Sequence, residues 1–437
     1  MIDDTTRLLG LDGLAVTGVQ DGTEGPVVHL ATADEQARRC PECGTRARRS
    51  KGRRTTRPRD LTVGGRRPEL VWRKRRWRCD EPSCRRRSFT EAVGSVPARK
   101  RLTVRLRVSA GAAVADGGRT VVQSARDHNV SWPVVSAAFT EYAKAVLPAE
   151  PQPVRVLGID EVRRGRPQWI FDEVTGTWQT AVDRWHVGFV DLSEGQGLLG
   201  QVEGRTAQTV VDWLLTRSQA WRDQVCYVAI DMCTVFKSAV RTALPNAQLV
   251  VDHFHVVQLA NATLTEVRRG VTVQARGRRG RKGNREWELR NRLTRRADSL
   301  SEQHLAELQA DLALLPKRIR EPIAAAWNAK EDLLDLLALA RTYPSRGQIL
   351  DALCQFYTRC GESGLPELER LAITVQTWWP EILAFIQTGI TNAGSEGTNR
   401  VIKTVARDAY GFRNPVNQRL RTRCATTRRT RGHLDPR

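Results

Sequence analysis

The spacing of hydrophobic residues divides the chain into a strand-rich middle and a helical segment that follows it. Short apolar runs bounded by turn residues predict strands, and apolar positions three and four apart predict helices. From residue 154 the two kinds alternate, with strands expected at 154–160, 186–192, 197–202, 225–231 and 247–252, and helices at 206–221 and up to Ala243. Such alternation is typical of an α/β sheet. Residues 260–388 instead show leucine and alanine at helical spacing, which predicts an all-helical insertion.

The chain before residue 150 has two further patterns. Short β-type runs at 14–18 and 27–31 are followed, over residues 36–98, by many arginines and too few apolar residues for a core that stands alone. Helical patterning then covers residues 103–146, where a Gly-Gly pair and a turn at 129–131 separate three helices. That spacing is typical of a helix-turn-helix, and the three prolines that follow it mark a linker.

These boundaries predict a multidomain α/β protein. We expect an N-terminal region with a metal-binding module at 1–98, a helix-turn-helix domain at 99–150, the first part of an α/β domain at 151–259, the helical insertion at 260–388, and the last part of the α/β domain at 389–437. The last part comprises a helix from about 394 to 408 and a basic tail. The length supports this division, because 437 residues exceed what a single core holds.

Composition excludes several classes of protein. With 40% hydrophobic residues and twelve tryptophans, the chain is able to bury substantial cores, which excludes a disordered, collagenous or coiled-coil protein. No run approaches the roughly 18 apolar residues of a membrane helix, and the first ten residues contain two aspartates and no apolar leader. Nine cysteines, an odd number, argue against a disulfide framework. We therefore expect a cytoplasmic protein that has no membrane partner and is not secreted.

Charge is the strongest compositional signal. The formal net charge is +22, and the basic residues gather in three blocks, at 38–107, 268–296 and 400–437, around an acidic remainder. Clustered positive charge predicts surfaces for a long polyanion, and nucleic acid is the natural candidate. A biased genome composition would explain the frequency of arginine but not its clustering.

Four cysteines in the first basic block have the spacing of a zinc site. Cys40 and Cys43 form one close pair, and Cys79 and Cys84 form the other. Two such pairs suit one tetrahedral Zn²⁺ with a structural role, because four thiolates leave no coordination position for water. The alternative, four cysteines paired by chance in a core, requires apolar residues that this segment lacks.

Basic residues near the cysteines are candidate DNA contacts. The candidates are Arg73, Lys74, Arg75, Arg76, Lys100 and Arg101. The first four interleave with Trp72 and Trp77, whose rings either cover the zinc knuckles, which is the role we favour, or stack on bases.

The helix-turn-helix is a second candidate DNA contact. Its second helix begins near Trp132, with Ser131 as N-cap and Pro133 in the first turn, and would enter a major groove. A three-helix linker bundle without DNA contacts is the alternative. The flanking Lys100 and Arg101 favour DNA binding.

Three carboxylates are candidate metal ligands. Asp160 is expected at the end of the first strand of the sheet, Asp231 at the end of the fourth, and Glu396 near the start of the final helix. Acids on neighbouring strand ends converge, and carboxylates without His or Cys partners suit two Mg²⁺ or Mn²⁺ ions that act on a phosphodiester. Taken singly, each acid is unremarkable, since strand-end aspartates commonly form turns. Taken together, and in a chain whose N-terminal region is basic, the three acids favour a catalytic role.

The segments around these acids resemble a known family. They are residues 157–161 (LGIDE), 229–232 (AIDM), 251–256 (VDHFHV), 391–403 (TNAGSEGTNRVIK) and 407–413 (RDAYGFR). They are similar to the ISL3 family of bacterial insertion-sequence transposases, and the resemblance runs from the cysteine pairs to about residue 420. It implies an RNase H-like catalytic domain of the DDE type, with Asp160, Asp231 and Glu396 as the metal-binding triad. A polar stretch at 163–184 is longer than the family leads us to expect and leaves the register of the second strand open.

The resemblance also indicates supporting residues. Asp252 and His255 match the family's D-x-x-H signature, and His255 either touches the scissile phosphate, orients an acid, or is a buried histidine at a helix start. Asn392 and Asn399 flank Glu396, in the cap region and one turn along the helix, and Asn392 is expected to support the site. Further along the same helix, Lys403 and Arg407 recur on roughly one face and are candidate phosphate contacts. Glu161 should point away from Asp160, as a structural acid.

The resemblance implies a transposase that binds the terminal inverted repeats of its element and joins them to target DNA. Its partner would be double-stranded DNA, it would associate with the bacterial nucleoid, and synapsis of two ends makes a homodimer or larger assembly plausible. The alternative is a transposase-derived regulator that binds a specific DNA sequence and has lost catalysis. The presence of all three acids favours the enzyme.

Overall fold

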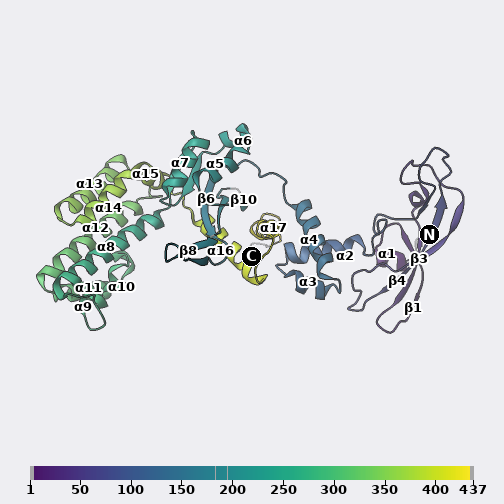
Figure 1. Ribbon diagram of the computed structural model, residues 1–437, viewed down its shortest axis with the longest axis horizontal. Coiled ribbons are helices and arrows are strands. Elements are labelled where there is room, and N and C mark those ends of the chain that lie inside the picture. The colour runs from purple at the N-terminus through teal and green to yellow at the C-terminus, as the bar shows by residue number, and fades with distance from the viewer. Residues whose placement is uncertain (1–3, 183, 194, 434–437) are drawn as a thin grey trace. The chain divides into compact units, whose positions relative to one another are not determined.

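The computed structural model describes residues 4–182, 184–193 and 195–433, which fold into two compact units (Figure 1). The first unit consists mainly of Met1–Ala149 with Thr404–Arg428, and the second mainly of Glu150–Lys403. Among the helices in the described ranges, none combines the length and the apolar character that crossing a membrane requires. The mixed α/β, multidomain fold that the sequence predicts is confirmed at this level.

A five-stranded sheet forms the N-terminal part of the first unit. Its elements are α1 (Asp4–Leu9), β1 (Leu14–Gln20), β2 (Val27–Thr32), the 3-10 helix η1 (Glu35–Arg38), β3 (Ser50–Thr56), β4 (Glu69–Arg78) and β5 (Ser88–Thr90). The strand order is β1-β2-β4-β3, with β5 on β4. Trp72 packs with Leu14 and Leu30 in one small core, and Trp77 is buried in another. Both tryptophans are therefore structural, as favoured, and residues 36–98 depend on β1 and β2 for their core.

Four helices pack together in the rest of the first unit. They are α2 (Val104–Ala115), α3 (Val121–Asp127), α4 (Trp132–Val146) and α17 (Pro415–Thr426). The hydroxyls of Thr103 and Thr120 cap α2 and α3. Ser131 stands at the N-cap of α4 with Pro133 in the first turn, as expected, although its side chain makes no capping hydrogen bond. The helix α17, which the sequence indicated only as a basic tail, buries Cys424 in the core that α2 and α4 share.

The second unit is built on a mixed five-stranded sheet. Its elements are β6 (Val156–Arg163), β9 (Trp185–Asp191), β10 (Leu198–Glu203), α5 (Ala207–Leu215), α6 (Gln219–Asp223), β11 (Tyr227–Ile230), α7 (Thr234–Ala243) and β12 (Gln248–Val251). The order is β10-β9-β6-β11-β12, and β11 is parallel to both of its neighbours. All five expected strands are confirmed. The single helix expected at 206–221 is wrong, because Ser218 caps a second helix after a break.

A separate hairpin interrupts the chain between β6 and β9. Its strands, β7 (Gln168–Asp172) and β8 (Thr177–Val182), pair with each other. They fill the polar stretch that left the register of the second strand open. That register is now defined, because β9 pairs antiparallel with β6 from Leu157 and Asp191 to Arg163 and Trp185.

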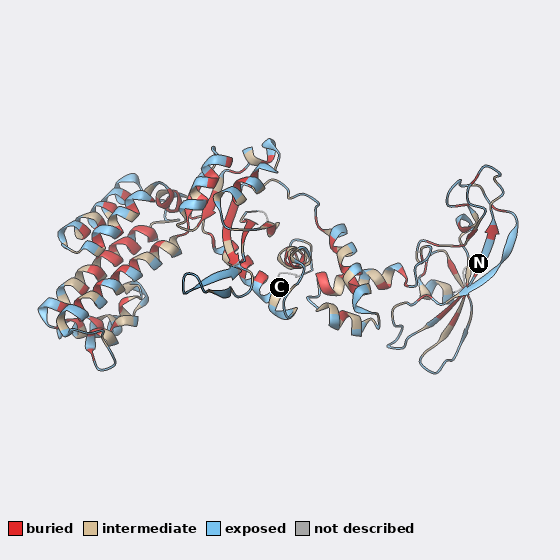
Figure 2. Ribbon diagram, in the orientation of Figure 1, coloured by how far each residue is buried: buried red, intermediate tan, exposed pale blue. Residues whose placement is uncertain are grey.

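Helices form the remainder of the second unit. They are α8 (His253–Arg276), α9 (Arg285–Glu288), α10 (Arg290–Leu293), η2 (Ala297–Ser299), α11 (Glu302–Ala313), α12 (Lys317–Ala338), α13 (Arg346–Glu362), α14 (Pro366–Thr377), α15 (Trp379–Thr388) and α16 (Ala393–Asp408). As expected, the described residues between 260 and 388 contain no strand. Residues of α8 and of α10 through α15 share one hydrophobic core with the sheet, seen as buried faces in Figure 2. That common core fixes the helices against the strands that carry the acids.

Candidate active site and zinc centre

Four cysteine thiols converge in the first unit. The Sγ atoms of Cys40, Cys43, Cys79 and Cys84 all lie within 4.8 Å of one another. Cys40 Sγ is 3.9 Å from Cys84 Sγ, and Cys43 Sγ is 3.5 Å from Cys79 Sγ. Sulfurs bound at about 2.3 Å to a tetrahedral Zn²⁺ are about 3.8 Å apart. The four residues therefore form a zinc-binding cluster, as their spacing predicted.

The backbone around the first cysteine pair prepares it for a metal. The N–H of Cys40 donates to the carbonyl of Thr45, and the N–H of Gly44 donates to the carbonyl of Cys40, which closes a tight knuckle. Hydrogen bonds from the side chain and backbone of Thr45 lower the pKa of the Cys43 thiol to about 6. A thiol with this pKa is a thiolate at neutral pH, which is the form that binds zinc.

Glu91 is a buried acid near the cysteines that the sequence analysis missed. Its carboxylate accepts hydrogen bonds from the indole N–H of Trp77 at 2.9 Å, the backbone N–H of Arg75 at 2.7 Å and the hydroxyl of Thr32 at 2.8 Å. It thereby ties β2 and β4 together beside the cluster. A buried carboxylate is stable here because its acceptor positions are used.

The three predicted catalytic acids come from three elements of the second unit. Asp231 directly follows β11, as expected. Asp160 lies within β6 rather than at its end, which corrects the expectation. The strand continues because β6 and β9 remain paired as far as Arg163. Glu396 stands in the first turn of α16.

The charges of the three carboxylates act on one another, so the three side chains lie near one another. Burial raises the pKa of Asp160 to about 7, and the charges of Asp231 and Glu396 contribute to the increase. Burial also raises the pKa of Asp231, and Glu396 again acts in the same direction. Acids that repel one another in this way are stabilised as carboxylates by a cation. The donor set, which is rich in oxygen and partly buried, fits Mg²⁺ or Mn²⁺.

Two asparagines hold these carboxylates. Asn392, predicted as support, donates from Nδ2 to Asp231 Oδ1 and to the carbonyl of Ile159, both at 3.3 Å. Asn399 donates from Nδ2 to Asp160 Oδ2 at 2.7 Å, a contact that the sequence analysis did not predict. The signal was present, because positions 392, 396 and 399 are four and three residues apart and lie on one helical face.

The D-x-x-H residues lie beside Asp231. His255 Nε2 is 3.2 Å from Asp231 Oδ2, so of the three roles left open the structure shows contact with an acid. Asp252 accepts a hydrogen bond from the N–H of Phe254 and caps α8. Burial raises the pKa of Asp252, but hydrogen bonds from His253 and Phe254 outweigh it and leave the pKa below its ordinary value. Asp252 is therefore a carboxylate that fixes the start of α8, where His255 stands.

Gly158 lies where the start of α16 packs closely against β6. A Cβ at this position would meet Ser395 Oγ at 2.2 Å, and Asn392 Oδ1 and a Leu192 methyl at 3.0 Å. We expect Gly158→Ala to displace the start of α16 and to lower the free energy of unfolding by about 1–3 kcal/mol, measured by urea denaturation. Gly188→Ala is the matched control, because in the neighbouring strand its Cβ would meet nothing closer than 3.8 Å. Equal losses in the two variants would contradict this close packing.

The predicted DNA contacts differ in exposure. Lys74 is buried, its ammonium lies 3.7 Å from the centre of the Trp72 ring, and burial lowers its pKa to about 8. Its side chain supports the sheet. The remaining basic candidates, Arg73, Arg75, Arg76, Lys100, Arg101, Lys403 and Arg407, are exposed.

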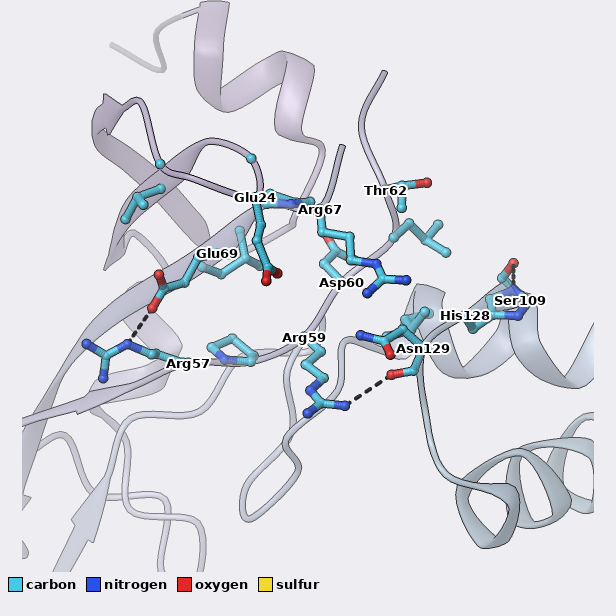
Figure 3. A pocket seen from close by; sticks show the side chains of 18 of the residues that line it. Glu24, Arg57, Arg59, Asp60, Thr62, Arg67, Glu69, Ser109, His128 and Asn129 are labelled. Carbon is cyan, nitrogen blue, oxygen red and sulfur yellow. Dashed lines mark hydrogen bonds and ion pairs between the residues drawn. The ribbon is translucent and has the colours of Figure 1, made fainter. Parts of the chain in front are cut away.

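A cavity of about 870 Å³ lies elsewhere in the first unit, between loops of the sheet and α2 and α3 (Figure 3). Its charges are largely matched within the protein. Arg57 pairs with Glu69 at 2.7 Å, and Arg59 donates to the carbonyl of Asn129 at 3.1 Å. None of the site residues predicted from the sequence lines this cavity.

Known proteins match this chain in two segments. Residues 157–422 match the ISL3-type family of DDE transposases, and residues 36–84 match a family described as the zinc-finger of transposase IS204/IS1001/IS1096/IS1165. The transposase for insertion sequence element IS1001 of Bordetella parapertussis is 27% identical over 236 residues, which are 53% of this chain and 55% of that protein. The match thus spans about half the length of that relative. Among solved structures, the Drosophila P element transposase strand transfer complex matches with a TM-score of 0.40 and 10% identity, over 76% of this chain and 92% of that one.

Proposed function

Since this chain belongs to the ISL3 family of transposases, we propose that it is a catalytically active DNA transposase. It binds the inverted repeats at the ends of its element, cleaves DNA there and joins the ends to target DNA. The second unit is the RNase H-like domain that performs the chemistry, with Asp160, Asp231 and Glu396 as its triad. Burial and the neighbouring acidic charges raise the pKa of Asp160 and of Asp231, and this supports the proposal most directly.

The residues around the triad fix its geometry. When bound, two Mg²⁺ or Mn²⁺ ions would activate a water or a 3′-hydroxyl and stabilise the leaving oxygen of the phosphodiester. Asn399 holds one carboxylate oxygen of Asp160, and Asn392 and His255 hold the two oxygens of Asp231. Because Asn392 directly precedes α16, Asn399 lies within that helix and His255 belongs to the first turn of α8, the acids have little freedom to move.

The first unit provides the surfaces for binding the ends. We assign α2, α3 and α4 as the helix-turn-helix, in which Trp132 at the start of α4 is about half exposed and available to a groove. The exposed arginines of β4 and the pair at 100 and 101 add phosphate contacts. Two ends brought together require at least two copies of the chain, so we propose a homodimer or larger assembly on DNA. The place of action is the bacterial cytoplasm, where the DNA lies.

Strand cleavage tests this function directly. A labelled duplex that carries one end of the element is incubated with the full-length protein, with and without Mg²⁺, and a gel shift measures binding to the same duplex. Nicking that depends on Mg²⁺, at the element boundary, supports the transposase. Binding without cleavage in either Mg²⁺ or Mn²⁺ would favour the regulator that binds DNA without chemistry.

The pKa of Asp160 makes stability depend on pH in the metal-free protein. Because the pKa is about 7 in the folded state and 3.8 without the protein's influence, the folded state binds more protons between these values. The free energy of unfolding should therefore fall as pH rises from 4 to 7, by on the order of 2–4 kcal/mol from this group. We expect Asp160→Asn to remove that part of the dependence in thermal denaturation with a chelator present. Mn²⁺ at pH 8 should raise the melting temperature of the wild type more than that of the variant.

A further inference from the structure

The hairpin β7–β8 exposes an unusual amount of apolar surface. Among the described residues, five large exposed apolar side chains belong to it, namely Trp169, Ile170, Phe171, Val174 and Trp178, with exposed fractions of 55%, 57%, 51%, 96% and 66%. Figure 2 shows the hairpin as exposed along its length, whereas the sheet from which it extends is buried. A cluster of exposed apolar side chains such as this one indicates an interaction site.

The three aromatic rings lie on one face of the ribbon. Trp169 pairs across the ribbon with Thr180, and Phe171 pairs with Trp178. The rings of Phe171 and Trp178 meet edge to face, with centroids 5.5 Å apart. Successive residues of a strand point to opposite faces, so Ile170 lies on the other face. One side of the hairpin therefore carries all three aromatic rings, together with Thr180.

The root of the hairpin is basic. Arg163, Arg166 and Arg184 are exposed there, and the guanidinium of Arg163 lies 4.5 Å from the centre of the Trp185 ring. Arg205 lies over the same ring at 5.0 Å. The two acids of the turn, at positions 172 and 173, are at the far end of the hairpin. A polyanion that meets the arginines at the root would thus have the aromatic face directly beyond them.

The hairpin also has a defined reach from the acids. Asp160 and the start of the hairpin belong to one continuous stretch of chain, and Trp169 lies nine positions after Asp160. At about 3.3 Å per residue, the two are at most about 30 Å apart. This corresponds to about nine base steps along a DNA strand. The aromatic face therefore lies within reach of the same DNA segment as the acids.

We propose that the aromatic face of the β7–β8 hairpin binds unpaired bases of the DNA being processed, by stacking. The inference rests on the proposed function, because it takes DNA as the substrate at the acids. Aromatic side chains stack on any base whose face is free, and a neighbouring positive surface holds the backbone. In an intact duplex the base faces are covered, so the hairpin recognises an opened or single-stranded segment within about nine nucleotides of the cleavage position.

A second copy of the chain fits this surface less well. A stable subunit interface involves roughly 20–30 residues on each side and a broad apolar centre. The aromatic face of the hairpin has only three rings, which lie among threonines and glutamines. The arginines at its root carry positive charge, which favours binding of an anion. Three rings on a narrow ribbon match one to three stacked bases in size.

Single-strand binding by the full-length protein tests the proposal. Fluorescence anisotropy measures the affinity for labelled oligothymidylate, for an element-end duplex with a short mismatched bubble, and for the fully paired duplex. Trp169→Ala is the main variant, because none of the ring contacts among the described residues of the hairpin involves Trp169. Trp169→Phe keeps an aromatic ring, Trp169→Leu keeps apolar bulk without a ring, and Ile170→Ser is the matched control on the opposite face.

The expected pattern separates stacking from other contacts. The alanine and leucine variants should bind oligothymidylate and the bubble about tenfold more weakly, the phenylalanine variant should stay within about threefold of the wild type, and Ile170→Ser should match the wild type. All four should bind the paired duplex normally. Wild-type protein that does not bind oligothymidylate, a leucine variant that binds like the wild type, or an equal loss in Ile170→Ser would overturn the proposal. So would a variant that dissociates a dimer and keeps its affinity for single strands, since the hairpin would then be a subunit contact.

This outcome is distinguishable from failure of the proposed function. Mg²⁺-dependent cleavage of a fully paired end depends on the acids, and it is measured on the wild type alone. Single-strand affinity is measured without metal. If the wild type does not cleave the paired end but still binds single strands, the proposed cleavage activity is wrong and the stacking surface stands.

Discussion

Replacing Asp231 by asparagine should lower the rate of DNA strand cleavage by at least about 10³-fold while the affinity for the element end stays within twofold of the wild type. Metal activation supplies several kcal/mol of transition-state stabilisation, and a misplaced ion loses the in-line geometry of the displacement. Asp160→Asn and Glu396→Gln should have the same effect, because all three carboxylates share one site. The measurement is the single-turnover nicking rate of a labelled end, beside a gel shift of the same duplex.

Two features make this prediction sharp. Removing one charge from a set of mutually repelling acids should preserve or raise the melting temperature of the metal-free protein, so lost activity would not reflect unfolding. Glu161→Gln is the matched control, because Glu161 follows Asp160 directly and its backbone carbonyl, which the substitution leaves in place, accepts the hydrogen bond from Asn399. Cleavage at the wild-type rate by Asp231→Asn would exclude Asp231 from the triad. An equally severe loss in Glu161→Gln would show that the site responds to charge in general.

The elements that are indicated by residues close together in the sequence were predictable. The cysteine pairs were recognisable because zinc ligands come from short knuckles, and the four thiols do meet. Strands such as β11 and β12 are buried on both faces and read as continuous apolar runs. Asp231 was placed correctly because it directly follows such a run.

Other features depend on contacts that are distant in sequence. Asp160 was expected to end its strand, but pairing with β9 extends β6 beyond it. The helix α17 buries polar and charged side chains, and Arg421 and Arg423 donate to the carbonyls of Arg119 and Pro148. Such a helix shows no apolar stripe, so its sequence resembles a basic tail.

The hairpin β7–β8 was hidden for the opposite reason. It is exposed on both faces, so no alternation of buried and exposed positions indicates its strands. Its aromatic residues are exposed and therefore contribute little to a folded core. This exposure becomes visible only when the burial of each side chain is known.

Removing zinc should unfold the cysteine module and weaken binding to the element end. The apolar core around the cluster consists of little more than Ala47, Trp77 and Phe89, which is too small to hold the module without a metal. Structural zinc contributes roughly 10–16 kcal/mol in small modules of this kind, which exceeds the stability of most domains. We expect one zinc per chain by metal analysis. Treatment with a strong chelator, or Cys40→Ser, should make the arginine-rich segment from 36 to 98 rapidly cleavable by trypsin and lower the affinity for the end by at least about tenfold.

The second unit provides the internal standard for the zinc experiment. Its sheet and helices have their own continuous core, so its tryptic fragments should stay protected when zinc is removed. Cys354→Ser is the matched variant, because Cys354 is an exposed cysteine of that unit, outside the cluster, and its loss should change neither zinc content nor DNA binding. A chelated protein that keeps residues 36–98 protected would mean that β1, β2 and the Glu91 hydrogen bonds suffice to hold the sheet. In that case zinc would shape the DNA-binding surface rather than stabilise the fold. The affinity for the element end would then fall without any change in the rate of tryptic cleavage.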